Sequence, residues 1–247
     1  MAAASTVLAT RRVSMVGMGR LGLCQALLFD RAGWGVLGCD VFPGYVDSIN
    51  DRSLRSREPD VEASLRACSR LQATTSLDET IDFSDLILIL VATPTGIGEH
   101  AYDTGTLGRV LFDIAGLGRP NKHIVICCTV LPGYIANVGS LILERCEGCT
   151  LSYNPEFIAQ GEIMRGLSAP DMVLIGEGSS AAGDILQELH ESSVSNRPRI
   201  CRMSPASAEI MKLSLNCFVT TKIAFANSKK ASPRPPVAHA ARDPAAA

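Results

Sequence analysis

The sequence predicts an α/β fold, a doubly wound and mainly parallel sheet, followed by a long central helix and a disordered C-terminal tail. Three observations lead to this prediction. Short β-branched runs alternate with amphipathic stretches from residue 12 to residue 203. A glycine motif joins the first of these runs to the first amphipathic stretch, and a proline-rich segment without large apolar side chains ends the chain.

The alternation gives the individual elements. We expect strands at residues 12–16, 36–40, 86–92, 124–129, 150–153, 172–176 and 199–201. The helices expected between them are residues 21–32, 43–50, 61–71, 106–117, 134–145 and 181–192. Parallel strands need such crossover helices, which cover both faces of the sheet.

Composition excludes several classes of function. Lys and Arg number 23 against 25 Asp and Glu, so no global positive charge exists to hold nucleic acid or an anionic membrane surface. The longest apolar run, residues 86–92, is too short to span a bilayer, which takes about 20 residues. The nine cysteines lie mostly in apolar segments without regular spacing, which favours a reducing, cytoplasmic location. Cys146 and Cys149 lack a second ligand pair, so we expect no metal site.

The glycine motif predicts a dinucleotide site. Gly17 allows a tight turn after the first strand, Gly19 lets the backbone approach a pyrophosphate, and Gly22 permits close packing of helix on strand. Asp40 follows the second strand, where a carboxylate accepts from ribose hydroxyls and favours NAD over NADP. A tight turn with an incidental aspartate is the alternative. The residues expected to contact NAD here are Gly17, Met18, Gly19, Arg20, Leu21, Gly22 and Asp40.

Other loops follow strands at the edge where open α/β sheets bind ligands. One contains Val91, Thr93, Pro94 and Thr95, and a second contains Cys128 and Thr129. Each could also be an ordinary strand-to-loop turn. In a third loop Glu156 follows Asn-Pro, and it is either a general acid/base or a first-turn acid stabilised by a helix dipole.

A long helix is expected from residue 207 to 227, after Ser204 as N-cap. Lys212 and Asn216 lie one turn apart on one face of this mostly apolar segment. If the face lines a cleft, the pair can stabilise a developing oxyanion; the alternative is a solvated stripe. The expected organisation is a short extension at 1–11, an NAD-binding Rossmann-like domain at 12–203, a truncated central helix for dimerisation and substrate at 204–228, and a disordered tail at 229–247.

Taken together, these motifs resemble the UDP-glucose/GDP-mannose dehydrogenase family over residues 12 to 228. The matching pieces, in chain order, are Gly17-x-Gly19-x-x-Gly22, Asp40, Thr93-Pro94-Thr95, Thr129-Val130, Asn154-Pro155-Glu156-Phe157, Gly161, Pro170-Asp171, Val173-Leu174-Ile175-Gly176, Ser207-Ala208-Glu209, Lys212 and Asn216. Many relatives carry glutamate where this chain has Gln160 and arginine where it has Met172.

The resemblance implies an enzyme that oxidises the primary alcohol of a nucleotide sugar, with UDP-glucose expected here, to a carboxylate with two NAD. It implies that Lys212 and Asn216 stabilise oxyanions, that Glu156 is the general acid/base and that Thr129 holds a water. The substrate contacts that it implies are Glu156, Phe157, Ile158, Ala159, Gln160, Lys212 and Asn216, and it adds Val91, Thr93, Pro94, Thr95, Cys128 and Gln160 to the NAD contacts.

The resemblance also implies parts that these 247 residues do not contain. The family's nucleophilic cysteine and its nucleotide-binding domain lie beyond the central helix, and Cys217 points about 100° away from Asn216. We therefore expect a truncated chain that is inactive alone and would form a homodimer through the central helix at full length. The alternatives are a catalytically dead NAD-binding module that pairs with a full-length relative, and a β-hydroxyacid dehydrogenase.

Overall fold

The computed structural model describes residues 11–95, 102–158 and 161–231. Its strands form one sheet in the order β3-β2-β1-β4-β5-β6-β7-β8. All neighbours pair in parallel except β6 and β7, which are antiparallel. The strands are β1 Arg12–Val16, β2 Gly35–Cys39, β3 Leu71–Thr74, β4 Leu86–Ile89, β5 His123–Ile126, β6 Thr150–Tyr153, β7 Met172–Gly176 and β8 Arg199–Met203. The predicted doubly wound, mainly parallel sheet is confirmed.

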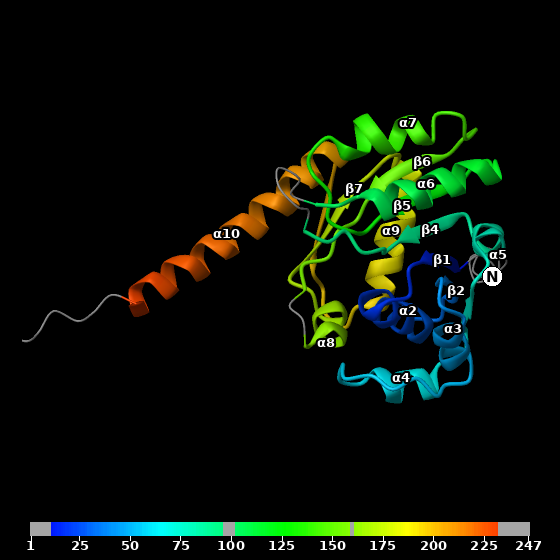
Figure 1. Cartoon of the computed structure of the whole chain (residues 1–247), viewed down its shortest axis with the longest axis horizontal. Coiled ribbons are helices and arrows are strands. Elements are labelled where there is room, and N and C mark those ends of the chain that lie inside the picture. The colour runs from blue at the N-terminus through cyan, green and yellow to red at the C-terminus, as the bar shows by residue number, and fades with distance from the viewer. Residues whose placement is uncertain (1–10, 96–101, 159–160, 232–247) are drawn as a thin grey trace, which may run out of the picture. The chain divides into compact units, whose positions relative to one another are not determined.

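Helices cover both faces of the sheet because successive strand residues point to opposite faces and both sets are apolar. In β4, Leu86 and Leu88 join the core that α2 and α9 complete, whereas Ile87 and Ile89 join the core beneath α6. Figure 1 shows α6 and α7 on one side of the strands and α2 on the other. The helical elements are α2 Arg20–Arg31, α3 Pro43–Asn50, α4 Val61–Ala67, α5 Leu77–Phe83, α6 Gly105–Leu117, the π-helix η1 Ile135–Gly139, α7 Ser140–Ile142, α8 Ile163–Ser168, α9 Ser180–Ser193 and α10 Pro205–Ala231.

Several elements differ from the prediction. The helix expected at 61–71 ends at Ala67, and Leu71 instead begins β3, which pairs with β2. Neither α5 nor α8 was predicted, although Ser76 caps α5 by accepting from the main-chain N–H of Glu79. The helix expected at 134–145 is the π-helix η1 followed by the single turn α7.

The strand order determines at which edge of the sheet a ligand can bind. Strands β2 and β3 extend the sheet to one side of β1, while β4 and the later strands extend it to the other. The loops that leave β1 and β4 therefore diverge, and a crevice for ligands opens between them at the carboxyl ends of the strands. The glycine turn follows β1, and the loop containing Val91 follows β4.

The chain divides into two compact units, Met1–Lys212 and Leu213–Ala247. Within the first unit, α10 begins with a buried carboxylate: Glu209 accepts from the main-chain N–H groups of Gly133 and Ile135, at 2.7 and 2.8 Å. Glu209 thus fixes the start of η1. The helix expected to end near residue 228 continues to Ala231, and the tail expected after it lies outside the described residues from 232 onward, as does the extension at 1–10.

No helix in the described part of the chain is both long and apolar enough to cross a membrane.

Candidate functional site

The glycine turn after β1 leaves an open position for a ligand. Gly17 has φ +99°, and a Cβ there would lie 2.7 Å from the carbonyl oxygen of Leu90. A Cβ on Gly22 would lie 2.1 Å from the oxygen of Gly17, so the helix packs directly on the turn. A Cβ on Gly19 would meet nothing within 4 Å. The protein's own packing requires glycine at positions 17 and 22, whereas a ligand can approach the main chain at Gly19.

Asp40 closes the turn from the neighbouring strand. It follows β2 directly, is half-buried, and accepts from the main-chain N–H groups of Met18 and Phe42 at 3.1 and 3.2 Å. The Met18 side chain is fully buried and packs over Gly38, so only the main chain of Met18 faces the turn. An open glycine at a helix N-terminus together with a strand-end carboxylate fits a dinucleotide, whose pyrophosphate and ribose need these groups.

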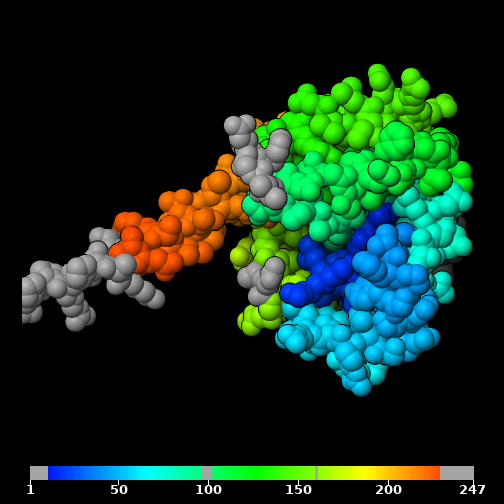
Figure 2. Space-filling model, viewed as in Figure 1, coloured from blue at the N-terminus to red at the C-terminus, as the bar shows by residue number. Residues whose placement is uncertain are grey.

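The loops after β4 and β5 lie at the same edge of the sheet. Val91 and Thr93 are half-buried, Pro94 is exposed, and Thr95 forms an isolated antiparallel bridge with Tyr102. After β5, Cys128 is buried and burial raises the pKa of its thiol to about 12, so it stays protonated and unreactive. The dark-blue N-terminal part of the described chain lies between light-blue and green parts on the face shown in Figure 2.

A pocket of about 530 Å3 gathers lining residues that include three of the four predicted to carry the chemistry, Thr129, Glu156 and Lys212. They come from α2, the loop after β5, the loop after β6, α8 and the first turns of α10. The lining residues are Arg20, Leu21, Thr129, Glu156, Ile158, Ile163 and Lys212. Residues far apart in the sequence thus share one cavity beside the glycine turn.

Lys212 is buried at 7 % exposure and held over the loop that carries Glu156. Its Nζ donates to the main-chain oxygen of Glu156 and lies 4.6 Å from the centre of the Phe157 ring. Burial lowers the pKa of the Lys212 ammonium, and the nearby Glu156 charge partly opposes that shift. A buried cation placed beside a carboxyl group can stabilise negative charge that develops in the pocket.

The Glu156 carboxyl is set to exchange protons near neutral pH. Burial raises its pKa to about 7, while a hydrogen bond from Gln25 and the charge of Lys212 lower it. The bond from Gln25 Nε2 to Glu156 Oε1 is 2.6 Å long. A carboxyl group with a pKa near the working pH suits general acid/base chemistry.

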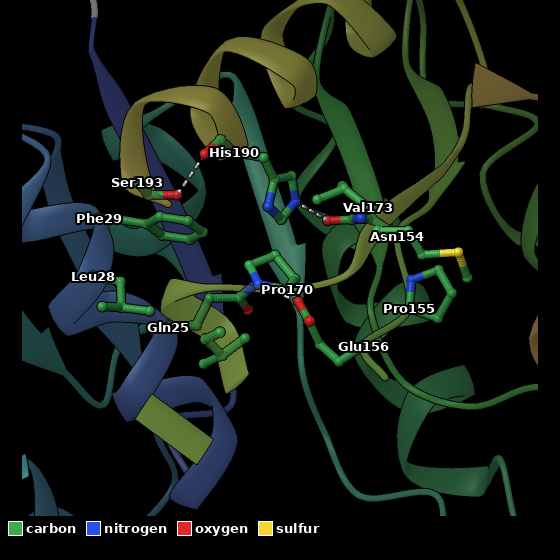
Figure 3. Close-up of a pocket in the computed structure, with 12 residues that line it drawn as sticks. Gln25, Leu28, Phe29, Asn154, Pro155, Glu156, Pro170, Val173, His190 and Ser193 are labelled. Atoms are coloured by element: carbon green, nitrogen blue, oxygen red, sulfur yellow. Dashed lines mark hydrogen bonds between the residues drawn. The ribbon is translucent and has the colours of Figure 1, made fainter. Parts of the chain in front are cut away.

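A buried polar network supports the loop from behind. Asn154 donates from Nδ2 to the oxygen of Leu174 at 2.9 Å, and its Oδ1 lies 2.7 Å from His190 Nε2, which therefore carries the proton. Figure 3 shows this pair in a smaller pocket that Gln25 and Glu156 also line. Sequence reasoning missed Gln25 and His190 as parts of the site. Both are polar residues on otherwise apolar helix faces, a signal that could have drawn attention to them.

The remaining predicted site residues are Asn216, Ala159 and Gln160. Asn216 belongs to the second unit, where it is half-buried and its main-chain oxygen accepts from Thr220. Ala159 and Gln160 lie outside the described residues. Within the described ranges no group of three or more His, Cys, Asp or Glu side chains could hold a metal ion.

Comparison with known proteins identifies relatives for this arrangement. The model of the UDP-glucose/GDP-mannose dehydrogenase family, NAD binding domain, matches residues 11–194. The GDP-mannose 6-dehydrogenase of Pseudomonas syringae pv. tomato is 35 % identical over 232 residues, which cover 87 % of this chain and 51 % of the relative. The chain therefore spans about half the length of the curated relatives that it matches.

Solved structures agree with this match. A ternary complex of GDP-mannose dehydrogenase from Pseudomonas aeruginosa superimposes with a TM-score of 0.81 at 29 % identity, covering 88 % of this chain and 52 % of that one. A UDP-glucose dehydrogenase from Pyrobaculum islandicum gives 0.81 at 26 % identity, with coverages of 89 % and 52 %. The chain belongs to the UDP-glucose/GDP-mannose dehydrogenase family, carries that family's NAD-binding domain and has NAD as its cofactor.

Proposed function

We propose that this chain supplies the NAD-binding part of a nucleotide-sugar 6-dehydrogenase that oxidises a sugar's primary alcohol to a carboxylate with two NAD. The observation that carries the proposal is the pocket in which Thr129, Glu156 and Lys212 meet beside the glycine turn. An alcohol oxidation needs a base for the hydroxyl proton and a cation for the developing oxyanion, and these residues supply both.

The cofactor lies along the carboxyl edge of the sheet in this proposal. Gly17 and Gly22 shape the turn, Gly19 receives the pyrophosphate, and Asp40 accepts from the ribose hydroxyls. NAD, when bound, supplies the hydride acceptor. The other residues assigned to NAD are Met18 and Leu21 through the turn, Arg20 at the helix start, Val91, Thr93, Pro94, Thr95 and Cys128 at the later loops, and Gln160.

The sugar lies in the pocket beside Glu156. The Glu156 carboxylate takes the proton of the sugar hydroxyl, and Lys212 together with Asn216 stabilises the oxyanion. Thr129 holds a water through its hydroxyl group, and the loop from Glu156 to Gln160 contacts the sugar. The pKa of Glu156 near 7 supports its role, because the group can both take and return a proton near neutral pH.

The substrate class is a nucleotide hexose with a free primary alcohol. UDP-glucose is the substrate expected from the sequence, and the similarity to GDP-mannose 6-dehydrogenases adds GDP-mannose as a second. These 247 residues span about half the length of the curated relatives that they match, so we assign cofactor binding and not complete turnover to them alone. Steady production of NADH from either sugar nucleotide by the chain alone would contradict that assignment.

Calorimetric titration with NAD and NADP tests the cofactor site. Wild type should bind NAD more tightly than NADP. Asp40→Asn should weaken NAD binding about tenfold, because the ribose hydroxyls lose a charged acceptor. The difference between the NAD and NADP affinities should also become smaller, because a neutral amide no longer repels a 2′-phosphate. Asp113→Asn, an exposed change on α6, is the matched control and should bind as wild type does. Equal NAD affinity in wild type and Asp40→Asn would overturn the assignment of Asp40.

A further inference from the structure

A buried glutamine lies directly behind Glu156. Gln25 sits in the middle of α2 with 1 % of its surface exposed, among neighbours that are otherwise apolar. Its Nε2 donates to Glu156 Oε1 at 2.6 Å, a contact between segments 131 residues apart. Burying an amide is costly unless its hydrogen bonds are made, so this residue calls for a role at the carboxyl group.

The other end of the same amide has no partner. Gln25 Oε1 is buried and accepts no hydrogen bond from the described residues. If the Glu156 carboxylate were always ionised, it would need only a hydrogen-bond donor from Gln25. The Oε1 atom of Gln25 would then be a buried acceptor that no donor ever uses, which is unfavourable. A carboxyl group that alternates between charged and neutral forms needs a donor in one form and an acceptor in the other, and an amide offers both.

We propose that Gln25 is a positioning residue for Glu156: its Nε2 donates to the ionised carboxylate and, after the amide rotates by half a turn, its Oε1 accepts from the protonated acid. Glu156 lines both the smaller pocket on the Gln25 side and the larger pocket beside Lys212. The pairing concerns this chain alone, and only its catalytic consequence rests on the proposed function.

Several other titratable or charged groups lie near Glu156. Burial lowers the pKa of His190 to about 4 and raises the pKa of the Cys127 thiol well above its usual value, so both stay neutral. Arg20 lines the larger pocket. Lys212 is the cation whose charge acts on the carboxyl group.

Titration by NMR tests the pairing without cofactor or sugar, so its outcome is independent of catalysis. The protein is labelled with 13C at the glutamate carboxyl carbons, and the Glu156 signal is the one missing from Glu156→Gln. Wild type should titrate with a midpoint near 7. Gln25→Met should raise the midpoint by about one pKa unit, because the hydrogen bond that the charged form loses is stronger than the one that the acid loses.

Leu28→Met is the matched control, since Leu28 lies one turn along α2, is buried and lines the same smaller pocket. Its midpoint should stay within a few tenths of a unit of wild type. An unchanged or lowered midpoint in Gln25→Met, or an equal shift in both variants, would overturn the proposal.

A second measurement needs no change at Gln25. The side-chain amide 15N and 1H signals of Gln25 in wild type should shift with pH at the midpoint of Glu156. In Glu156→Gln they should be independent of pH. If the chemical shifts of the Gln25 amide in wild type do not change as Glu156 ionises, the rotation of the amide is refuted.

Discussion

At the scale of single residues, His190 couples the loop of Glu156 to the stability of the fold. The imidazole is buried at 7 % exposure, bonds to Asn154 and meets the edge of the Phe29 ring with 6.5 Å between centroids. Burial lowers its pKa to about 4. The neutral histidine therefore connects α9 to the loop after β6 through its hydrogen bond to Asn154.

This burial predicts a loss of stability in acid. The unfolded chain protonates His190 near its ordinary pKa of about 6.5, whereas the folded chain does so only near 4. The stability that neutral His190 contributes is thus complete above about pH 6.5 and is lost as the pH falls to about 4, a loss of about 3 kcal/mol. Urea unfolding of wild type and His190→Gln at pH 7 and pH 5 measures the part of this loss that falls above pH 5, about 2 kcal/mol. The difference between the two proteins is needed, because the raised pKa of Glu156 adds stability over the same pH range in both.

His190→Gln supplies the control for that prediction. Glutamine keeps an N–H donor for Asn154 but cannot take up a proton. The variant should be less stable than wild type at pH 7 by about 1–3 kcal/mol through lost packing, yet lose less stability on going to pH 5. An identical pH dependence in both proteins would show that another group is responsible.

The sequence identified the residues of the larger pocket better than those of the smaller one. Glu156 and Lys212 could be singled out because a carboxylate after Asn-Pro and a lysine on an apolar helix are unusual locally. Gln25 and His190 stand out locally only as polar residues on apolar helix faces, and their partners lie 131 and 36 residues away, which local patterns do not reveal. Glu209 lies one turn before Lys212 on α10 and is also polar, yet its role is structural, because it accepts hydrogen bonds at the start of η1.

At the scale of elements, the glycine turn contains one glycine that the fold needs, Gly22, and one that we expect only NAD binding to need, Gly19. Gly22→Ala places a methyl group 2.1 Å from the Gly17 oxygen, so α2 must move away from β1. We expect it to lower the free energy of unfolding by about 2–4 kcal/mol and to abolish NAD binding. Gly19→Ala meets no protein atom within 4 Å, so its stability should stay within about 0.5 kcal/mol while NAD binding weakens at least tenfold.

Urea unfolding and calorimetry on the two variants make the comparison. Both add the same methyl group to the same turn, so any difference comes from what the group meets. A Gly19→Ala protein that binds NAD as wild type does would place the pyrophosphate elsewhere. A Gly22→Ala protein of full stability would show that the helix and turn can separate without cost.

The elements that sequence patterns missed are the short ones. β3 has only Leu71 and Ala73 pointing inward, too few for a period to be recognised, and it is defined by pairing with β2. The six residues of α8 likewise gain their helical state by packing on α2 and not from local propensity. The π-helix η1 packs closely on β6 at Gly139, where a Cβ would lie 2.5 Å from Leu151. Tertiary contacts decide these segments.

At the scale of the whole molecule, the two compact units differ in what holds them together. The first contains both apolar cores of the sheet, in which residues such as Leu88 and Ile89 are fully buried. In the second, Phe218, Val219 and Ile223 on α10 are 60 %, 47 % and 57 % exposed. An isolated helix gains little stability from its backbone bonds alone, because helices in proteins depend on packing.

We therefore predict that amide hydrogens of residues 213–231 exchange with solvent on the order of 100-fold faster than those of β1 and β4, measured by mass spectrometry at low protein concentration. Phe218→Ser is the control and should leave exchange in β1 and β4 unchanged, because the side chain lies outside the first unit. Protection of residues 213–231 equal to that of β4 under these conditions would contradict the prediction. Protection that rises with concentration in wild type, but not in Phe218→Ser, would show that a second copy covers this face, as the expected homodimer requires.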